Sequence, residues 1–383
     1  MSLSRQPANR LVVNLENIAH NLAALRACLP AGSRVAGVVK ADAYGHGLVP
    51  VARVLKKEGA EALAVASLDE AAVLRREGIE GPILILLGLW PGQAARALEL
   101  EVTPILTSRE AVEELAAAGR AAGRPATCHI KVDTGMGRLG LRPEECLEFL
   151  DWAAGLEGIR VTGLVSHLST AGEPGDQHCR KQARIYLELL QACRRRGQQL
   201  PDSSLAGSGG ALVPPPGLED MPLMVRLGIS LYGGLPSPGA AGRAELRDAM
   251  SFRSRLLAVR LAPAGTLVSY GGTYQVPRDT WLGVVPVGYS EGYPRTLSNR
   301  AVMLVGGRRV PVRGRVCMNL TMLDLGGLEP RPRPGDQVVL LGRQGEQEIA
   351  LEELAQWADT ISYEITCSLG AANPRHYQPP LTG

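Results

Sequence analysis

Short apolar runs alternate with helical patterns between about residue 34 and residue 233, and this alternation limits the fold more than any other feature. Most runs are rich in Val, Ile and Leu and do not alternate polar with apolar residues, as is typical of parallel strands buried on both faces. Amphipathic segments such as SREAVEELAAAGRAAG (108–123) and DQHCRKQARIYLELLQACRRRG (176–197) lie between most of them. The runs are VAGVVK (35–40), ALAVAS (62–67), ILILL (83–87), VTPIL (102–106), TCHIKVD (127–133), VTGLVSHL (161–168), SSLAGS (203–208) and LMVRLGISLYG (223–233).

Eight strands with intervening helices predict an α/β fold, a (β/α)8 TIM barrel. A doubly wound open sheet would produce the same alternation and stays the alternative. The segment GGALVPPPGLEDMP (209–222) contains a run of three prolines, which leaves room for only a short helix or a loop.

The sequence pattern changes after PSPGAAG (236–242), where short segments rich in Val, Leu, Thr and Arg alternate with Gly and Pro turns. This pattern predicts a mainly antiparallel β domain, with a single helix at LEELAQWAD (351–359). We therefore expect two domains, a barrel over residues 8–240 and a β domain over residues 241–383.

The bulk composition excludes several classes of protein. A net charge of +3 without a long Lys/Arg run argues against nucleic-acid binding, and no apolar run is long enough to span a membrane. The N-terminus lacks the apolar stretch of a secretory signal. The seven Cys have neither CxxC nor Cys/His spacing, which indicates reduced thiols and no metal site. We expect a soluble, cytoplasmic protein.

Polar residues gather where the predicted strands end. They are Lys40, Lys131 with Asp133, His167, Ser208 and Arg226. A TIM barrel carries its function at these carboxyl ends. Lys40 stands at the tip of a buried strand, where desolvation lowers the pKa of an amine towards a nucleophile able to form a Schiff base. The alternative is a lysine that merely extends from a strand end into solvent.

The segment around this lysine, VVKADAYGHG (38–47), resembles the cofactor-lysine segment of the alanine racemase family. Further matching motifs follow in order: KVDTGMGRLG (131–140), SHLS (166–169), VRLGISLYG (225–233), VSYGGTY (268–274), VGYSEGYPR (287–295), GRVCMN (314–319) and SYE (362–364). The resemblance implies a barrel followed by a β domain, pyridoxal phosphate as cofactor, and a homodimer in which each active site is completed by the partner subunit.

Racemisation makes two demands that the implied residues meet. The cofactor must delocalise the carbanion left when the α-proton is removed, and inversion then needs a base on each face. By resemblance, Lys40 holds the cofactor and is one base, and Tyr270 from the partner subunit is the other. His167 would hydrogen-bond Tyr270. Arg226 would face the ring nitrogen of the cofactor and, because arginine keeps its proton, would limit other pyridoxal chemistry.

The remaining site residues also follow from the resemblance. Arg138 would bind the substrate carboxylate, positioned by a carbamylated Lys131. The pocket would be crowded by three residues of the β domain, Tyr289, Met318 and Asn319. The cofactor phosphate would be bound by Tyr44, Ser208, Gly228, Ile229 and Tyr363.

Three departures from the family pattern bear on the substrate. Asn319 stands where the family usually has Asp, LAGSGG lacks an Asn that commonly precedes Ser208, and the ending GAANPRHY is altered. We expect a racemase that interconverts L- and D-alanine and supplies D-alanine for peptidoglycan. A racemase for serine or for a range of small amino acids is the alternative. More distant alternatives are a non-catalytic protein that binds pyridoxal phosphate and a decarboxylase of similar architecture.

Overall fold

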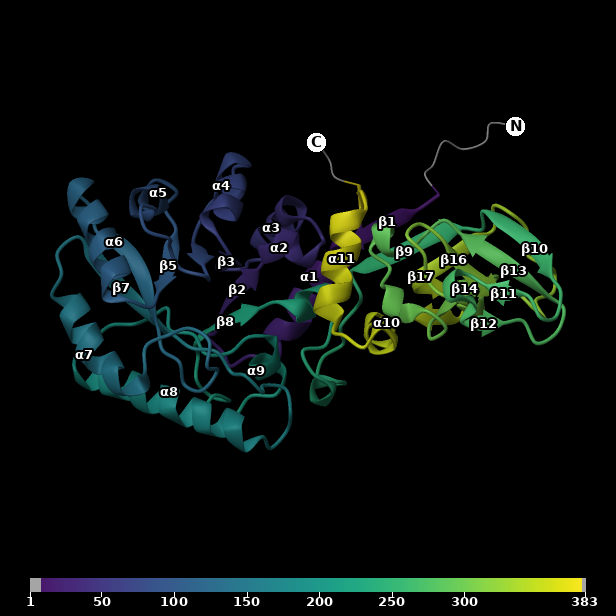
Figure 1. Cartoon of the computed structure of the whole chain (residues 1–383). Coiled ribbons are helices and arrows are strands. Elements are labelled where there is room, and N and C mark those ends of the chain that lie inside the picture. Colours follow the sequence, from purple (N-terminus) through teal and green to yellow (C-terminus); the bar gives the residue numbers. More distant parts are fainter. Residues whose placement is uncertain (1–7, 381–383) are drawn as a thin grey trace. The chain divides into compact units, whose positions relative to one another are not determined.

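The computed structural model describes residues 8–380. Its contacts divide the chain into two compact units. The barrel unit comprises Ile18–Ala43 and Leu48–Leu246. The β unit comprises the chain up to Asn17, the short stretch Tyr44–Gly47, and the chain from Arg247 onward. Each unit has its own sheets and core (Figure 1).

The barrel unit is built on seven parallel strands in the order β7-β6-β5-β4-β3-β2-β8. Their apolar side chains are buried, which explains the unbroken Val, Ile and Leu runs in the sequence. The strands are β2 (Arg34–Val38), β3 (Ala62–Val65), β4 (Ile83–Ile85), β5 (Thr103–Leu106), β6 (Ala126–Lys131), β7 (Ile159–Val165) and β8 (Met224–Leu227).

Residues 203–207 connect the two ends of this row of strands. Ser204 forms an isolated parallel bridge with Val165 of β7, and Gly207 forms one with Arg226 of β8. The predicted fold class is therefore confirmed, with one correction: SSLAGS (203–208) is not a regular strand. Ser and Gly have low strand propensity, and the hydroxyl of Ser203 accepts the N–H of Leu164 at 3.1 Å beside these backbone bonds. Ser208 already begins the short helix α9 (Ser208–Leu212) that the three prolines allow.

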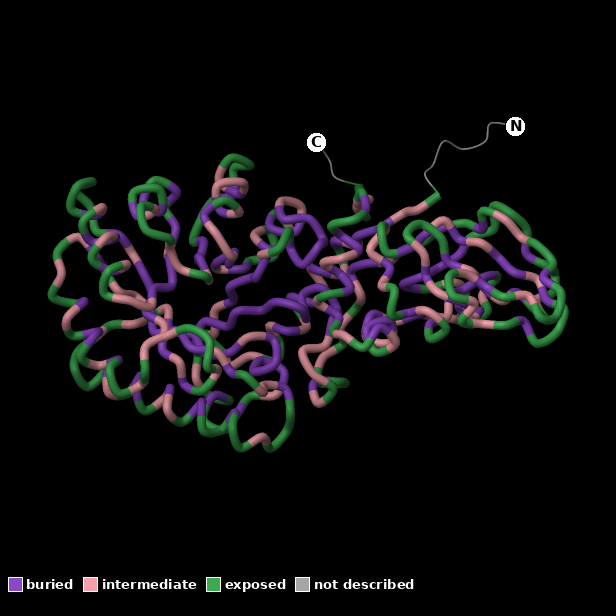
Figure 2. The backbone as a smooth tube through the Cα atoms, in the orientation of Figure 1, coloured by how far each residue is buried: buried purple, intermediate pink, exposed green. Residues whose placement is uncertain are grey.

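Helices cover the outside of the barrel strands (Figure 1). In α6 the side chain of Ser108 caps the first turn, and Val112, Leu115, Ala116 and Gly119 recur on one buried face. Figure 2 shows the same division, with buried strands and exposed outer turns. The helices are α1 (Leu15–Arg26), α3 (Leu48–Lys57), α4 (Leu68–Arg76), α5 (Ala94–Glu99), α6 (Arg109–Ala121), α7 (Pro143–Ala154) and α8 (Gln177–Arg195).

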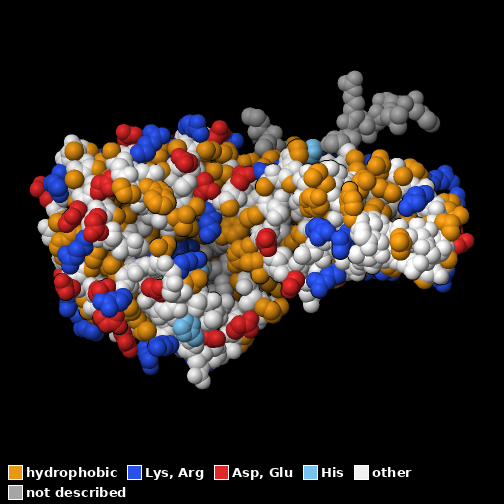
Figure 3. Space-filling model, viewed as in Figure 1, with side chains coloured by type: hydrophobic (Ala, Val, Ile, Leu, Met, Phe, Trp, Pro, Cys, Tyr) orange, Lys and Arg blue, Asp and Glu red, His pale blue; other side chains and the backbone are white. Residues whose placement is uncertain are grey.

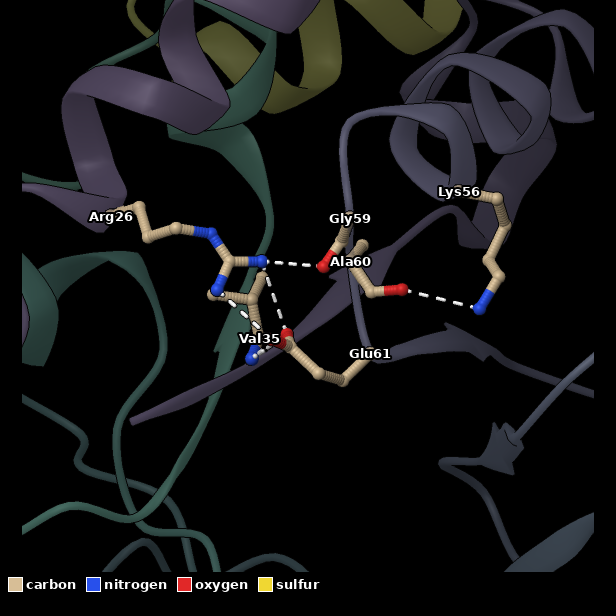
Figure 4. A network of polar contacts seen from close by, with 6 residues as sticks. All are labelled: Arg26, Val35, Lys56, Gly59, Ala60 and Glu61. Carbon is tan, nitrogen blue, oxygen red and sulfur yellow. Dashed lines mark hydrogen bonds and ion pairs between the residues drawn. The ribbon is translucent and has the colours of Figure 1, made fainter. Parts of the chain in front are cut away.

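A polar network fastens α1 to the start of the barrel sheet (Figure 4). The carboxylate of Glu61 accepts hydrogen bonds from Arg26 at 3.0 and 3.1 Å and from the N–H of Val35 at 2.7 Å. Burial raises the pKa of Glu61, but these hydrogen bonds outweigh it and lower the pKa overall. The network gives the backbone N–H of Val35, near the start of β2, a hydrogen-bond acceptor. It lies at the opposite end of β2 from Lys40.

The β unit is mainly antiparallel, as the sequence predicts. Its larger sheet has the order β15-β14-β17-β9-β1-β19, with β18 paired to β17 and only β1–β19 parallel. The strands are β1 (Arg10–Asn14), β9 (Met250–Arg255), β14 (Val302–Val305), β15 (Arg308–Pro311), β17 (Gln337–Gln344), β18 (Gln347–Ile349) and β19 (Arg375–Gln378). A second sheet contains β10 (Ala258–Ala262), β13 (Thr280–Val285) and β16 (Thr321–Asp324), and β11 (Leu267–Val268) pairs with β12 (Tyr274–Gln275).

The single predicted helix near the C-terminus is two helices, α10 (Leu351–Ala358) and α11 (Ser362–Ala372). The sequence of α11 hides it, because Thr, Cys and Gly weaken its helical propensity. Within residues 8–380, single-turn 3₁₀ helices complete the fold: η1 (Ile229–Tyr232), η2 (Pro238–Ala240), η3 (Tyr270–Gly272), η4 (Tyr289–Glu291) and η5 (Arg295–Leu297). Across residues 8–380, every helix is too short or too polar to cross a membrane.

Candidate active site

Lys40 begins a strained turn at the carboxyl end of β2. The turn α2 (Lys40–Tyr44) is left-handed, with φ of 53°, 53° and 54° at Ala41, Asp42 and Ala43. Left-handed backbone is costly for residues that carry a Cβ atom, and it persists only where the surroundings hold it. Glu70 accepts the N–H of Ala41 at 2.7 Å, and Asp42 accepts the N–H of Leu48 at 2.6 Å. These bonds keep Lys40 at the strand tip, where the sequence predicts it.

Arg226, on β8, is buried and donates to several acceptors of the barrel unit. Its guanidinium donates to the carbonyl of Ser166 at 2.6 Å and of Leu205 at 3.3 Å, and also to the hydroxyl of Ser204. Burial lowers the pKa of Arg226 to about 10, which leaves the side chain charged at neutral pH. The same guanidinium contacts Nδ1 of His167 at 3.2 Å.

This contact and the burial of the ring determine the protonation state of His167. Burial, followed in order by the charges of Arg226, Lys131, Arg138 and Lys40, lowers the pKa of His167 to about 3. The imidazole is therefore neutral. Arginine can only donate a hydrogen bond, so Nδ1 is the acceptor and the ring proton is on Nε2. His167 is left as a hydrogen-bond donor through Nε2.

Lys131 lies in the same cationic cluster. Burial lowers the pKa of Lys131 to about 7, helped by the charges of Arg226 and Arg138 and opposed by Asp133. An appreciable fraction of this amine is neutral, and hence nucleophilic, near pH 7.

Asp133 organises the turn that carries Arg138. Its carboxylate accepts the N–H groups of Gly135 at 2.9 Å, Met136 at 2.7 Å and Arg138 at 3.0 Å. Burial raises the pKa of Asp133, and these bonds more than reverse that effect. The barrel unit thus brings together five predicted site residues: Lys40, Lys131, Arg138, His167 and Arg226.

Gln182 is a site-supporting residue that the sequence reasoning missed. It is fully buried on α8, where its Oε1 accepts the N–H and O–H of Ser169 at 2.9 and 3.0 Å. Its Nε2 donates to the carbonyl of His167 at 3.0 Å and lies 3.5 Å from Oγ1 of Thr134. One amide therefore ties the turn that carries Arg138 to the loop that carries His167. The detectable signal is a polar residue within the apolar stripe of an amphipathic helix, between Cys179 and Tyr186.

The predicted phosphate-binding residues of the barrel unit lie beside one another. Ser208 begins α9, Gly228 follows β8, and the hydroxyl of Ser208 accepts the N–H of Gly228 at 3.0 Å. Ile229 begins η1 and is buried, as is Ser208.

Two predicted tyrosines pair in the β unit. The rings of Tyr44 and Tyr363 are 5.8 Å apart, and burial raises the pKa of both phenols, to about 12 for Tyr363. Tyr44 reaches α11 because Gly45 has no side chain: a Cβ atom there would lie 2.2 Å from the carbonyl oxygen of Thr366.

Four further predicted residues lie in the β unit, three of them on two joined turns. Tyr289 donates its N–H to the carbonyl of Cys317 at 3.1 Å, beside Met318. Asn319 donates from Nδ2 to Glu291 at 2.7 Å, and Glu291 also accepts the N–H of Gly288 at 2.8 Å.

Their side chains are unusually exposed for apolar groups. Tyr289 is 45% exposed, Met318 56% and Tyr270, on η3, 71%. Figure 3 shows charged side chains of both signs interspersed with hydrophobic ones over the face in view.

Comparison with known proteins gives one consistent family. The model described as "Alanine racemase, N-terminal domain" matches residues 13–236, and "Alanine racemase, C-terminal domain" matches residues 249–377. The alanine racemase of Symbiobacterium thermophilum is 42% identical over 365 residues, which cover 95% of this chain and 96% of the relative.

Solved structures agree with this. The crystal structure of alanine racemase from D-cycloserine-producing Streptomyces lavendulae matches with a TM-score of 0.90 and 36% identity over 99% of this chain and 98% of that one. The alanine racemase of Bartonella henselae with covalently bound pyridoxal phosphate matches with a TM-score of 0.86 and 26% identity over 97% of this chain and 100% of that one.

Proposed function

The chain belongs to the alanine racemase family, and we propose that it interconverts L- and D-alanine with pyridoxal phosphate as cofactor and with Lys40 and Tyr270 as the two bases. It is an isomerase, as its named relatives are. The serine, broad-specificity and non-catalytic alternatives are not favoured, because relatives that match over nearly the whole chain are alanine racemases.

The cationic cluster around His167 is the observation that carries this proposal. Four cations act on this one imidazole. A cluster with this surplus of positive charge suits a ligand with a phosphate and a substrate with a carboxylate. The residues therefore fit pyridoxal phosphate, the cofactor named for the Bartonella henselae enzyme.

We assign the cofactor contacts by residue. Lys40 would hold the cofactor covalently and Arg226 would donate to its ring nitrogen. The phosphate would be bound by Ser208, Gly228 and Ile229 and by the hydroxyls of Tyr44 and Tyr363. When bound, pyridoxal phosphate makes the α-proton of an amino acid acidic enough for a side chain to remove.

The chain's own residues then move the proton. The amine of Lys40 takes or returns it on one face, and the phenol oxygen of Tyr270 does so on the other, as inversion requires. The neutral His167 donates from Nε2, which would stabilise Tyr270 when it has lost its proton. Arg226 stays charged throughout.

Arg138 would bind the substrate carboxylate, and we propose that Lys131 becomes carbamylated beside it. In this step the neutral amine attacks carbon dioxide, a C–N bond forms, and one proton is released, which leaves a carbamate anion. The lowered pKa of Lys131 supplies the neutral amine. The product would place a negative charge between two arginines, where a positive charge is disfavoured.

The exposed β-unit residues complete the proposal. We propose a homodimer in which Tyr270, Tyr289, Met318 and Asn319 enter the partner's active site, because large apolar side chains exposed together mark an interaction surface. We also propose a cytoplasmic enzyme that supplies D-alanine for peptidoglycan, since this is the role that the family resemblance implies.

The test is α-proton exchange and loss of optical rotation in heavy water, with L-alanine and L-serine in parallel. Exchange with racemisation of alanine, at least tenfold faster than of serine, is the expected result. Comparable rates would move the substrate to a broader class. Cofactor binding without exchange of either amino acid would overturn the proposal in favour of a non-catalytic binding protein.

A further inference from the structure

The turn that carries Tyr270 has an unusual backbone. It joins β11 to β12 through residues 269–273, and φ is positive at Ser269, Gly271 and Gly272. The two glycines adopt such values freely. Ser269, with φ of 63° and ψ of −173°, occupies a region that is essentially reserved for glycine. A serine is tolerated there only if the contacts of its side chain offset the backbone strain.

The side chain of Ser269 contacts a segment that is distant in the sequence rather than its own turn. It makes no capping bond to η3. Its hydroxyl donates to the carbonyl of Arg315 at 2.6 Å and lies 3.2 Å from Sγ of Cys317. The strained backbone is what turns this hydroxyl towards residues 315–317.

The other end of the turn is held by Asn299. Its Nδ2 donates to Oγ1 of Thr273 at 3.1 Å, and its Oδ1 accepts the N–H of Gly314 at 2.6 Å. Gly314 has to be a glycine here, because a Cβ atom would lie 2.6 Å from the carbonyl oxygen of Val268. Both ends of the Tyr270 turn are thus fastened to one segment, residues 314–317.

We propose that Ser269 and Asn299 are positioning residues that fix the direction of the Tyr270 phenol. The proposal rests on the proposed function, in which Tyr270 is a base. The side chain of Tyr270 is 71% exposed within its own subunit, so its direction depends on the backbone beneath it. We call the contacts that Ser269 and Asn299 make to residues 314–317 the clamp on Tyr270. Cys317 links this clamp to Tyr289, because its carbonyl accepts the Tyr289 N–H.

Ser269→Ala and Ser269→Gly separate the two roles of this residue. Both variants remove the hydroxyl, but Ala keeps the backbone strain and Gly relieves it. We therefore expect the Gly variant to fold even if the Ala variant does not. We expect kcat/KM to fall about tenfold in both variants, since small misplacements of a reacting group have effects of this order. Thr266→Ala is the control, because that hydroxyl bonds only locally, to the carbonyl of Pro263 at 2.6 Å.

Isotope effects show whether the fall in kcat/KM comes from slower proton transfer by Tyr270. The equilibrium constant of racemisation is one, so kcat/KM must fall equally in both directions. The α-deuterium isotope effect should nevertheless rise for the enantiomer whose proton Tyr270 takes and fall for the other. A general loss of structure would not produce this opposite pair of changes.

A second readout needs no cofactor and no turnover. In the cofactor-free protein, Ser269→Ala and Asn299→Ala should speed amide hydrogen exchange in residues 267–275. Iodoacetamide should also alkylate Cys317 several-fold faster in Ser269→Ala. The Thr266→Ala control should leave both rates unchanged.

Tyr270→Phe, measured in parallel, distinguishes the two proposals. If Tyr270→Phe leaves both isotope effects as in the wild type, the proposed function of Tyr270 fails. If Tyr270→Phe shifts them in opposite directions while the Ser269 variants change neither these effects nor the exchange of residues 267–275, the positioning proposal is overturned.

Discussion

At the scale of single residues, His167 shows how burial and a neighbouring cation together fix the protonation state of an imidazole. Arg226 donates to Nδ1, and the imidazole stays neutral because its pKa is lowered to about 3. In an unfolded chain the pKa would be near 6.5, so between these values the unfolded state binds more protons. Stability therefore rises with pH in this window and is lost as the pH falls from about 6.5 towards 3.

His167→Asn tests this pH dependence, because asparagine keeps polar groups but does not titrate. The stability of the cofactor-free wild type should fall more steeply on acidification, by up to about 1.4 kcal/mol per pH unit relative to the variant. Urea unfolding from pH 7 to pH 4.5 measures the difference. Parallel curves for the two proteins would contradict a neutral His167, as would an NMR titration of its ring near pH 6.5.

Lys131 offers a second prediction at this scale. With a pKa of about 7 the amine is available for carbon dioxide, whereas an ordinary lysine is not. Protein equilibrated with ¹³C-labelled bicarbonate at pH 8 should show a carbamate carbon signal that is lost on acidification, and Lys131→Arg should lack it. An identical signal in Lys131→Arg would assign the carbamate to another group.

At the scale of elements, α8 contributes to the site without touching substrate. Gln182 holds the loops of His167 and Thr134 from a fully buried position. Gln182→Leu would remove the acceptor of the Ser169 N–H and the donor to the His167 carbonyl, and each lost hydrogen bond costs about 1 kcal/mol of stability. It should also lower kcat/KM about tenfold, since Arg138 and His167 both lose support.

The control for this prediction is Gln191→Leu, on the exposed face of the same helix. It should change the free energy of unfolding by less than about 0.5 kcal/mol. Urea unfolding and steady-state kinetics of both variants decide the matter, and equal stability of the two would show that the Gln182 amide is dispensable.

Elements also show what the sequence predicts and where it fails. The seven barrel strands were predictable because a parallel strand buried on both faces must be apolar throughout. Residues 203–207 and α11 were not, because Ser, Gly and Thr give weak local signals and tertiary contacts decide their structure. The pairing of β1 with β9 and β19 joins residues over 200 apart, which no local pattern contains.

The site divides in the same way. The positions of Lys40, His167 and Arg226 at or next to strand ends were predictable because ionisable groups beside apolar runs are conspicuous, while their roles stay predictions. The left-handed turn at Ala41–Ala43 was not, because no glycine marks it. The clamp on Tyr270 was not predictable either, because no local pattern links Ser269, Asn299 and Cys317, which come together only in the folded chain.

At the scale of the whole molecule, the prediction concerns which chain supplies each residue of an active site. The predicted domain boundary between residues 240 and 241 stays a prediction, as does the dimer. If Tyr270 serves the partner's site, each active site takes Lys40 from one chain and Tyr270 from the other. A dimer of one Lys40→Ala chain and one Tyr270→Phe chain then holds one site with both defects and one site with none.

Mixing the two inactive homodimers under conditions of subunit exchange should therefore restore activity. Random exchange makes half of the dimers mixed, each with one intact site of two, so about a quarter of the wild-type activity should return. Mixing Lys40→Ala with a Lys40→Arg dimer is the control and should restore nothing, because every site then lacks the lysine. If size-exclusion chromatography shows that mixed dimers form and activity stays at background, Lys40 and Tyr270 act within one chain, and the exposed tyrosine must be covered in another way.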